Sequence, residues 1–152
     1  MCIKKAPKSQ KINLLGAVEA GSGEIVVEEV EGNTTHAEVF SFLEKLGEDA
    51  TKECPVFVLL DQASYHTHKK ILEERMVWAK RHFYVFYLPT YSPHLNDMER
   101  VWKHLKYHLL RRRFYKNVTE LRQDVFSKLK EFFYSSSVPS VDELLAKELY
   151  AA

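Results

Sequence analysis

Residues 55–60, with the sequence PVFVLL, form a continuous apolar run that ends at Asp61. An apolar run of this length predicts a strand buried on both faces, as in the middle of an α/β sheet. Such folds bind ligands at the carboxyl ends of their strands, where a carboxylate faces solvent from a rigid backbone. Asp61 is therefore the first candidate site residue. The alternative is that Asp61 only caps the turn after the strand.

The rest of the chain predicts strands and helices around this run. Two β-branched segments joined by a turn with two glycines indicate a hairpin. Apolar residues at helical spacing indicate helices, and in one of them they predict a buried face of Ile71, Leu72, Met76 and Ala79. The expected order is strands 12–18 and 25–30, a helix that opens within 32–35 and ends at Gly47, strand 55–60, helix 68–80, strand 83–88, and helices 96–114, 119–134 and 140–150. This order predicts an α/β fold in which helices flank one mixed sheet.

Length and composition limit the class of protein. The 152 residues suit one domain with a hydrophobic core. No apolar run is long enough to span a membrane, and residues 1–11 carry four lysines without the apolar segment of a secretory signal. Cys2 and Cys54 lack metal-ligand spacing and predict neither a disulfide framework nor a zinc site. Together these features predict a cytoplasmic protein.

The net charge of +1 conceals an uneven distribution along the chain. Residues 1–50 contain nine acidic and five basic residues, whereas residues 100–119 contain seven Lys or Arg and no acid. Basic charge confined to one stretch indicates a polyanionic partner such as DNA. The alternative is a solvated basic helix without a partner.

Glu99 is the second candidate site residue. It follows Asp61 after 37 intervening residues and lies near the start of an expected helix. A structural alternative is that Asn96 and Glu99 form a capping box, in which the Glu99 carboxylate returns to the amide of Asn96. Two carboxylates on the ends of separate rigid elements also suit Mg²⁺, which assists phosphodiester hydrolysis.

Basic residues follow Glu99 along the same expected helix. Lys103 and Lys106 stand four and seven positions after Glu99, so the helix is expected to place them on one face with it. Such lysines can hold DNA phosphates beside a metal site, or simply form a Glu–Lys surface pair. Arg111, Arg112 and Arg113 continue the candidate DNA-binding run, whereas Trp102 is expected to anchor the core.

Two motifs carry a resemblance to a known family. Residues 59–66, LLDQASYH, resemble the second-acid motif of mariner-superfamily transposases from bacterial insertion sequences, and residues 88–103, LPTYSPHLNDMERVWK, resemble their third-acid motif. Weaker similarity extends over residues 12–121. The resemblance implies a ribonuclease H-like fold and a DDE triad of carboxylates that binds two Mg²⁺ or Mn²⁺ ions. It also implies cleavage at transposon ends and strand transfer into target DNA.

The resemblance also assigns roles to individual residues. Asp61 is implied as the second acid and Glu99 as the third, both as catalytic residues and metal ligands. His66 is implied to lie near the site, where it contacts phosphate or orders the loop; the alternative for His66 is a structural hydrogen bond. Asp97 is expected to favour the helix N-terminus instead, because side chains two positions apart on a helix point about 200° apart.

The sequence departs from the family pattern at three places. Gln62 stands where the family has Asn, and residues 97–98 are Asp-Met where it has Pro-Ile. No Asp or Glu occurs before Glu19, which matches no first-acid motif. We therefore expect an incomplete catalytic core without its first strand, either the second reading frame of a frameshifted element or a truncated remnant.

The expected organisation is a polar lead-in at residues 1–11, a DDE core at 12–116 and C-terminal helices packed on the core at 117–152. An unpaired sheet edge recruits other strands. We therefore expect a homodimer, or pairing with a transposase segment encoded upstream. The alternative function is an inactive fragment that regulates the transposase by binding DNA or by mixed oligomerisation.

Overall fold

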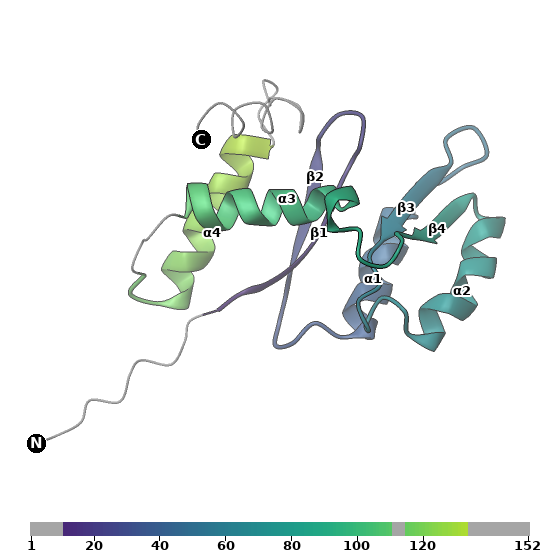
Figure 1. Ribbon diagram of the computed structural model, residues 1–152, viewed down its shortest axis with the longest axis horizontal. Coiled ribbons are helices and arrows are strands. Elements are labelled where there is room, and N and C mark those ends of the chain that lie inside the picture. Colours follow the sequence, from purple (N-terminus) through teal and green to yellow (C-terminus); the bar gives the residue numbers. More distant parts are fainter. Residues whose placement is uncertain (1–10, 111–114, 134–152) are drawn as a thin grey trace, which may run out of the picture.

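The computed structural model describes residues 11–110 and 115–133, and Figure 1 shows how their elements are arranged. The order is β1 (Asn13–Val18), β2 (Ile25–Val30), α1 (His36–Leu46), β3 (Val56–Leu60), α2 (Lys69–Lys80), β4 (Phe83–Tyr87), the 3-10 turn η1 (Pro93–Leu95), α3 (Asp97–His104), the π-helical segment η2 (Leu105–Leu109) and α4 (Val118–Phe133). This order matches the strands and helices expected up to residue 133, except within the expected helix 96–114. That segment is α-helical over Asp97–His104 and π-helical over Leu105–Leu109, and residues 111–114 lie outside the described residues. The expected helix 140–150 lies outside the described residues.

The first two strands form the expected hairpin. β1 and β2 pair antiparallel in a register that runs from Asn13 opposite Val30 to Val18 opposite Ile25. Gly23 adopts a φ of 73° in the connecting turn, a conformation that side chains with a Cβ adopt rarely. The turn therefore uses one of the two glycines for its backbone conformation.

Helix α1 begins and ends where the sequence predicts. Thr35 caps its N-terminus, and Glu38 returns to the backbone of Thr35 in a complete capping box. Gly47 ends the helix at a φ of −92°, so its role is not a left-handed backbone. A Cβ at Gly47 would lie 2.6 Å from the Phe83 ring, so the glycine leaves room for close packing of the helix end on β4.

Strands β3 and β4 pair in parallel, but the expectation that β3 is buried on both faces is wrong. Val56, Val58 and Leu60 pack toward α1 and α2, whereas the side chains of Phe57 and Leu59 are 61% and 63% exposed. Both helices cover the same face of this sheet, and no described element covers the other. An apolar run shows that both faces are suited to burial but not which of them is covered.

The buried face of α2 also differs from the expectation. Ile71 is buried as expected, but the second buried residue is Trp78, and Met76 and Leu72 are 73% and 44% exposed. Burial of the large Trp78 indole against Phe83 removes more apolar surface than burial of Met76 would. The helix is therefore rotated about its axis from the face that the smaller apolar residues indicated.

The strands form two sheets of two strands each, where the sequence predicted one mixed sheet. Each sheet has its own core among the described residues. The hairpin packs with α3 and α4 around Ile25, Val101 and Leu129, whereas β3 and β4 pack with α1 and α2 around Leu43, Ile71 and Trp78. This mixed α/β arrangement is compatible with a ribonuclease H-like fold. Within the described ranges, every helix is too short or too polar to cross a bilayer.

Candidate active site

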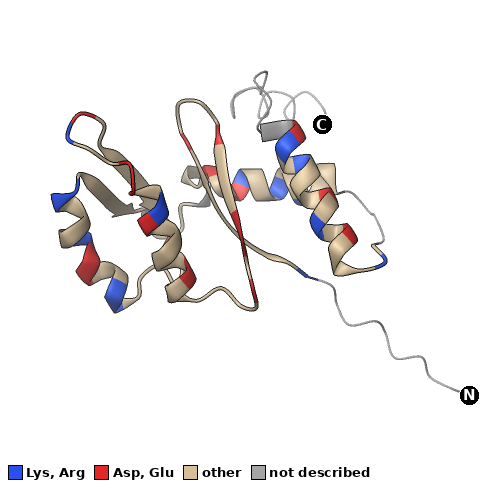
Figure 2. Cartoon of the chain, turned by 180° about the vertical axis from the view of Figure 1, so that it is seen from behind, with Lys and Arg blue, Asp and Glu red and all other residues tan. Residues whose placement is uncertain are grey.

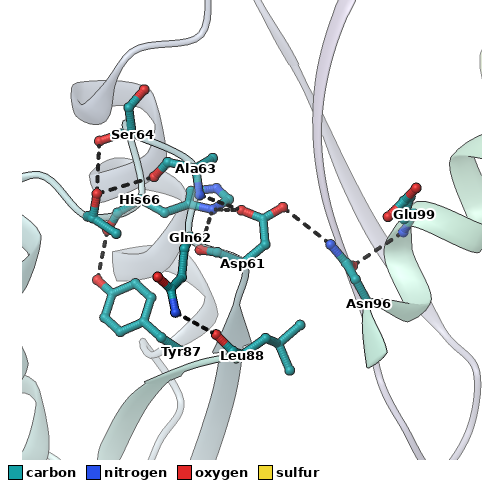
Figure 3. A network of polar contacts seen from close by, with 10 residues as sticks. Asp61, Gln62, Ala63, Ser64, His66, Tyr87, Leu88, Asn96 and Glu99 are labelled. Atoms are coloured by element: carbon teal, nitrogen blue, oxygen red, sulfur yellow. Dashed lines mark hydrogen bonds and ion pairs between the residues drawn. The ribbon is translucent and has the colours of Figure 1, made fainter. Parts of the chain in front are cut away.

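Asp61 directly follows β3, and three groups contact its carboxylate (Figure 3). Oδ1 lies 2.6 Å from Nδ1 of His66 and accepts a hydrogen bond of 3.0 Å from the backbone N–H of Ala63. Oδ2 accepts a hydrogen bond of 3.3 Å from Nδ2 of Asn96. The side chain remains 45% exposed, so the carboxylate is held in place while part of it still faces solvent.

His66 lies beside Asp61, as the sequence motif implied. Its side chain is only 15% exposed, and the Tyr87 hydroxyl donates a hydrogen bond of 2.7 Å to its backbone carbonyl. Burial raises the pKa of Tyr87, so this hydroxyl keeps its proton and remains a donor at neutral pH. Tyr87 therefore fixes the loop that carries His66, and the contact of His66 with DNA stays a prediction.

Glu99 projects from the first turn of α3, which Asn96 caps. Asn96 Oδ1 accepts from the backbone N–H of Glu99 at 3.3 Å, which is one half of the expected capping box. Among the described residues the return bond to the amide of Asn96 is not formed. The Glu99 carboxylate instead pairs with Lys103 at 2.8 Å and is 38% exposed. The Glu38 carboxylate of α1 bonds the backbone of its N-cap residue, whereas the Glu99 carboxylate does not and so can contact other groups.

The two acids line one cavity of about 310 Å³. Asp61 and Gln62 enter it from the end of β3, Asn96 and Glu99 from the start of α3, and residues 88–92 form its wall. The Gln62 side chain donates a hydrogen bond of 2.9 Å to the carbonyl of Leu88, which ties the ends of β3 and β4 together. Asp61 and Glu99 were expected to converge on one site, and the structure places both in the lining of one cavity.

Asp97 is the first residue of α3 and does not line this cavity. Its carboxylate forms an ion pair of 3.0 Å with Arg100, in line with the direction expected for a residue two positions before Glu99. Within the described ranges no three His, Cys, Asp or Glu side chains form a group that could hold a metal ion. Two carboxylates are within the number that Mg²⁺ commonly takes, because water and phosphate complete its shell.

Of the basic residues expected to bind DNA after Glu99, Lys103 and Lys106 lie within the described residues. Figure 2 shows basic residues along α3 and α4 and acidic residues on the hairpin. Lys103 pairs with Glu99, and the exposed Lys106 places its ammonium 5.3 Å from the ring centroid of Tyr107. Arg111, Arg112 and Arg113 lie outside the described residues. Trp102 packs on the hairpin, as expected for a core anchor.

Two features of the site were not predicted from the sequence. Asn96 was expected only as a helix cap, yet it also contacts Asp61. Tyr91, in the cavity wall, has a φ of 59° and is 99% exposed. A positive φ at a residue with a large side chain is uncommon and concentrates at functional sites. The sequence of residues 88–92 gave no signal for this conformation.

Comparison with known proteins agrees with this geometry. The family model for the DDE superfamily endonuclease matches residues 2–122. The chain is also 32% identical over 101 residues to the insertion element IS630 uncharacterized 39 kDa protein of Shigella sonnei. That match covers 64% of this chain and 28% of the relative's length. The findings confirm the resemblance to DDE transposases of insertion sequences, and the chain belongs to the DDE superfamily of endonucleases.

Proposed function

We propose that this chain forms part of the catalytic core of a DNA transposase, which hydrolyses phosphodiester bonds at transposon ends and transfers the strand to target DNA. The observation that carries the proposal is that Asp61 and Glu99, from separate elements, line one cavity. The family membership and the basic residues after Glu99 support the same activity.

The residues at the cavity have distinct roles in this proposal. Asp61 and Glu99 would hold a divalent cation, Mg²⁺ or Mn²⁺, which supplies Lewis-acid stabilisation and an activated oxygen nucleophile when it is bound. Lys103 and Lys106 would bind the DNA backbone and orient it, because phosphate contacts fix the position of a duplex on a protein. The mostly buried His66 orients Asp61 through its contact with Oδ1.

Metal binding to the purified chain tests this proposal. Calorimetry should detect Mn²⁺ binding that Asp61→Asn and Glu99→Gln each abolish. Asp97→Asn is the matched control, because Asp97 lies on the same helical turn but pairs with Arg100. Binding that survives both site substitutions would place the metal elsewhere and reject the proposed roles of the two acids.

A second candidate function is a catalytically inactive fragment that binds DNA or the full transposase. The observation that favours it is that, among the described residues, Asp61 and Glu99 are the two carboxylates that line the cavity, whereas a DDE triad has three. Under this function, the chain binds DNA through its basic residues but does not cleave transposon ends with Mg²⁺ or Mn²⁺ present. Robust cleavage by the chain alone would reject this second function.

The proposal includes a further strand between the two sheets. A groove of about 480 Å³ lies between β1 and β3, with Val39 and Phe42 of α1 and Trp102 of α3 among its lining residues. Each of these strands has one partner within the described ranges, so each has an open edge. An extended segment that pairs with both edges would join the two sheets into the single mixed sheet of a ribonuclease H-like fold.

This segment would come from a second copy of the chain or from another part of the transposase. The hydrogen bonds of Val56 and Leu60 run to the β4 side, so the alternating ladder directs the backbone of Leu59 into the groove. Leu59→Pro therefore removes a donor from the groove edge only, whereas Val58→Pro disrupts β3–β4 pairing. Light scattering should show self-association that Leu59→Pro abolishes; a monomer at high concentration would contradict the homodimer.

A further inference from the structure

Asn96 lies between the two acids of the cavity and contacts the elements that carry both (Figure 3). Its Oδ1 accepts from the backbone N–H of Glu99, and its Nδ2 donates to Oδ2 of Asp61, each at 3.3 Å. We propose that Asn96 is a positioning residue that fixes the separation between the Asp61 and Glu99 carboxylates. This inference rests on the proposed function, in which the two acids act as a pair.

The need for such a residue follows from the two cores. Asp61 extends from β3, which packs with α1 and α2, whereas Glu99 extends from α3, which packs with the hairpin. The two carboxylates are therefore held by different sets of packing contacts. The hydrogen bond from Asn96 to Asp61 directly joins residues 35 positions apart in the sequence and spans these two parts of the molecule.

The side chain of asparagine is suited to this double role. A helix N-cap needs only an acceptor, and Ser, Thr and Asp supply one as well. The carboxamide of Asn supplies an acceptor and a donor from one planar group. Oδ1 of Asp61 already contacts His66 and Ala63, so Nδ2 of Asn96 meets the remaining oxygen, Oδ2.

The chain contains a matched cap that lacks this second contact. Asn117 precedes α4, and its Oδ1 accepts a hydrogen bond of 2.9 Å from the backbone N–H of Glu120. Within the described residues, Nδ2 of Asn117 donates to no other group. Asn117 thus shows what the cap alone contributes, and the difference between the two asparagines isolates the contact with Asp61.

The consequence for the site concerns geometry and not charge. Mg²⁺ demands near-ideal octahedral coordination, so two carboxylates on separate elements bind it well only at a fixed separation. Groups that orient metal ligands typically contribute tenfold to a hundredfold to metal affinity. With a cap that contacts only Glu99, α3 would still form, but the distance between the carboxylates would vary.

The test compares Asn96→Ser with Asn117→Ser in the full chain. Serine keeps the oxygen that accepts from the helix backbone but lacks the amide nitrogen that donates to Asp61. Both variants should unfold within a few degrees of the wild-type temperature, because Ser and Asn cap helices about equally well. Only Asn96→Ser should weaken Mn²⁺ binding in calorimetry, by about tenfold or more. Equal Mn²⁺ affinity in the wild type and Asn96→Ser would overturn the inference.

Two further measurements separate this inference from the proposed function. If Asp61→Asn and Glu99→Gln leave Mn²⁺ binding unchanged, the proposed metal site fails, whatever Asn96 does. A double-mutant cycle without metal then tests the contact between Asn96 and Asp61 through the unfolding temperature. Asn96→Ser should lower the unfolding temperature more in the wild type than in an Asp61→Ala background, whereas Asn117→Ser should act equally in both. The same shift for Asn96→Ser in both backgrounds would overturn the positioning role.

Discussion

The imidazole of His66 and the carboxylate of Asp61 are in direct contact, with Nδ1 of His66 2.6 Å from Oδ1 of Asp61. The contact joins a mostly buried ring to a carboxylate that is 45% exposed. Because Nδ1 is used here, only Nε2 of His66 is left to face other groups. The first effect of this histidine is therefore to orient the acid.

Replacement of His66 should weaken metal binding in the absence of DNA. His66→Ala removes the group that holds Oδ1 of Asp61, and the Mn²⁺ affinity should fall about tenfold or more in calorimetry. His66→Asn, which keeps a polar group near the position of Nδ1, should recover part of the affinity. His68→Ala is the control, since His68 caps α2 and stacks on His36. Unchanged Mn²⁺ affinity in His66→Ala would instead favour a DNA contact as its main role.

The packing of the hairpin against α3 depends on Gly16. A Cβ at this position would lie 2.6 Å from Cζ2 of Trp102 and 2.7 Å from Cε of Met98. Gly16→Ala should therefore lower the free energy of unfolding by about 1–3 kcal/mol, the usual cost of overpacking a core. Denaturant titration measures this change. Gly21→Ala is the control, because a Cβ there meets nothing within 4 Å; an equal loss for both would show that packing against α3 is not responsible.

The exposed Lys106 should contribute to DNA affinity through phosphate contacts. Lys106→Ala should weaken binding to duplexes of any sequence and reduce the slope of log affinity against log salt by about 1. Fluorescence anisotropy at several salt concentrations measures both quantities. Lys80→Ala, at the end of α2, is the control. An unchanged salt slope in Lys106→Ala would mean that this lysine lies away from the bound DNA.

Stability should fall on acidification partly because of Glu44. The pKa of Glu44 is lowered, mainly because the Trp78 indole N–H donates to its carboxylate and further because Arg81 pairs with it. A lowered folded-state pKa gives stability that is present above the unfolded value of about 4.3 and is lost as pH falls through the folded value. Glu44→Gln should therefore cost at most about 1 kcal/mol at pH 7, since a third of this side chain is exposed.

The pH series of this variant supplies the check. The difference in unfolding free energy between the wild type and Glu44→Gln should shrink as the pH is lowered from 7 to about 3. Glu53→Gln, which replaces an exposed loop carboxylate, should show no such trend. A difference that stays constant over the series would exclude the charge of Glu44 as the cause.

Local sequence signals predicted the elements well, because their causes are local. The hairpin turn at Gly23, the start of α1 after Thr35 and the cap by Asn96 each depend on residues within a few positions. The exposed face of β3 and the rotation of α2 were not predicted, because both depend on which elements come to cover them. The motifs predicted that Asp61 and Glu99 belong to one site. The link through Asn96 was not predicted, since it requires two distant elements to approach each other.

The division into two cores gives the site a mechanical property. Asp61 is attached to the β3–β4 sheet, and Glu99 is attached to α3, which packs on the hairpin. Any rotation of one part against the other changes the distance between the two carboxylates. A strand that paired with both β1 and β3 in the groove between them would resist that rotation. Assembly of the sheet would then also fix the distance between the two acids, and in a chain without this strand the distance would depend on the contact between Asn96 and Asp61.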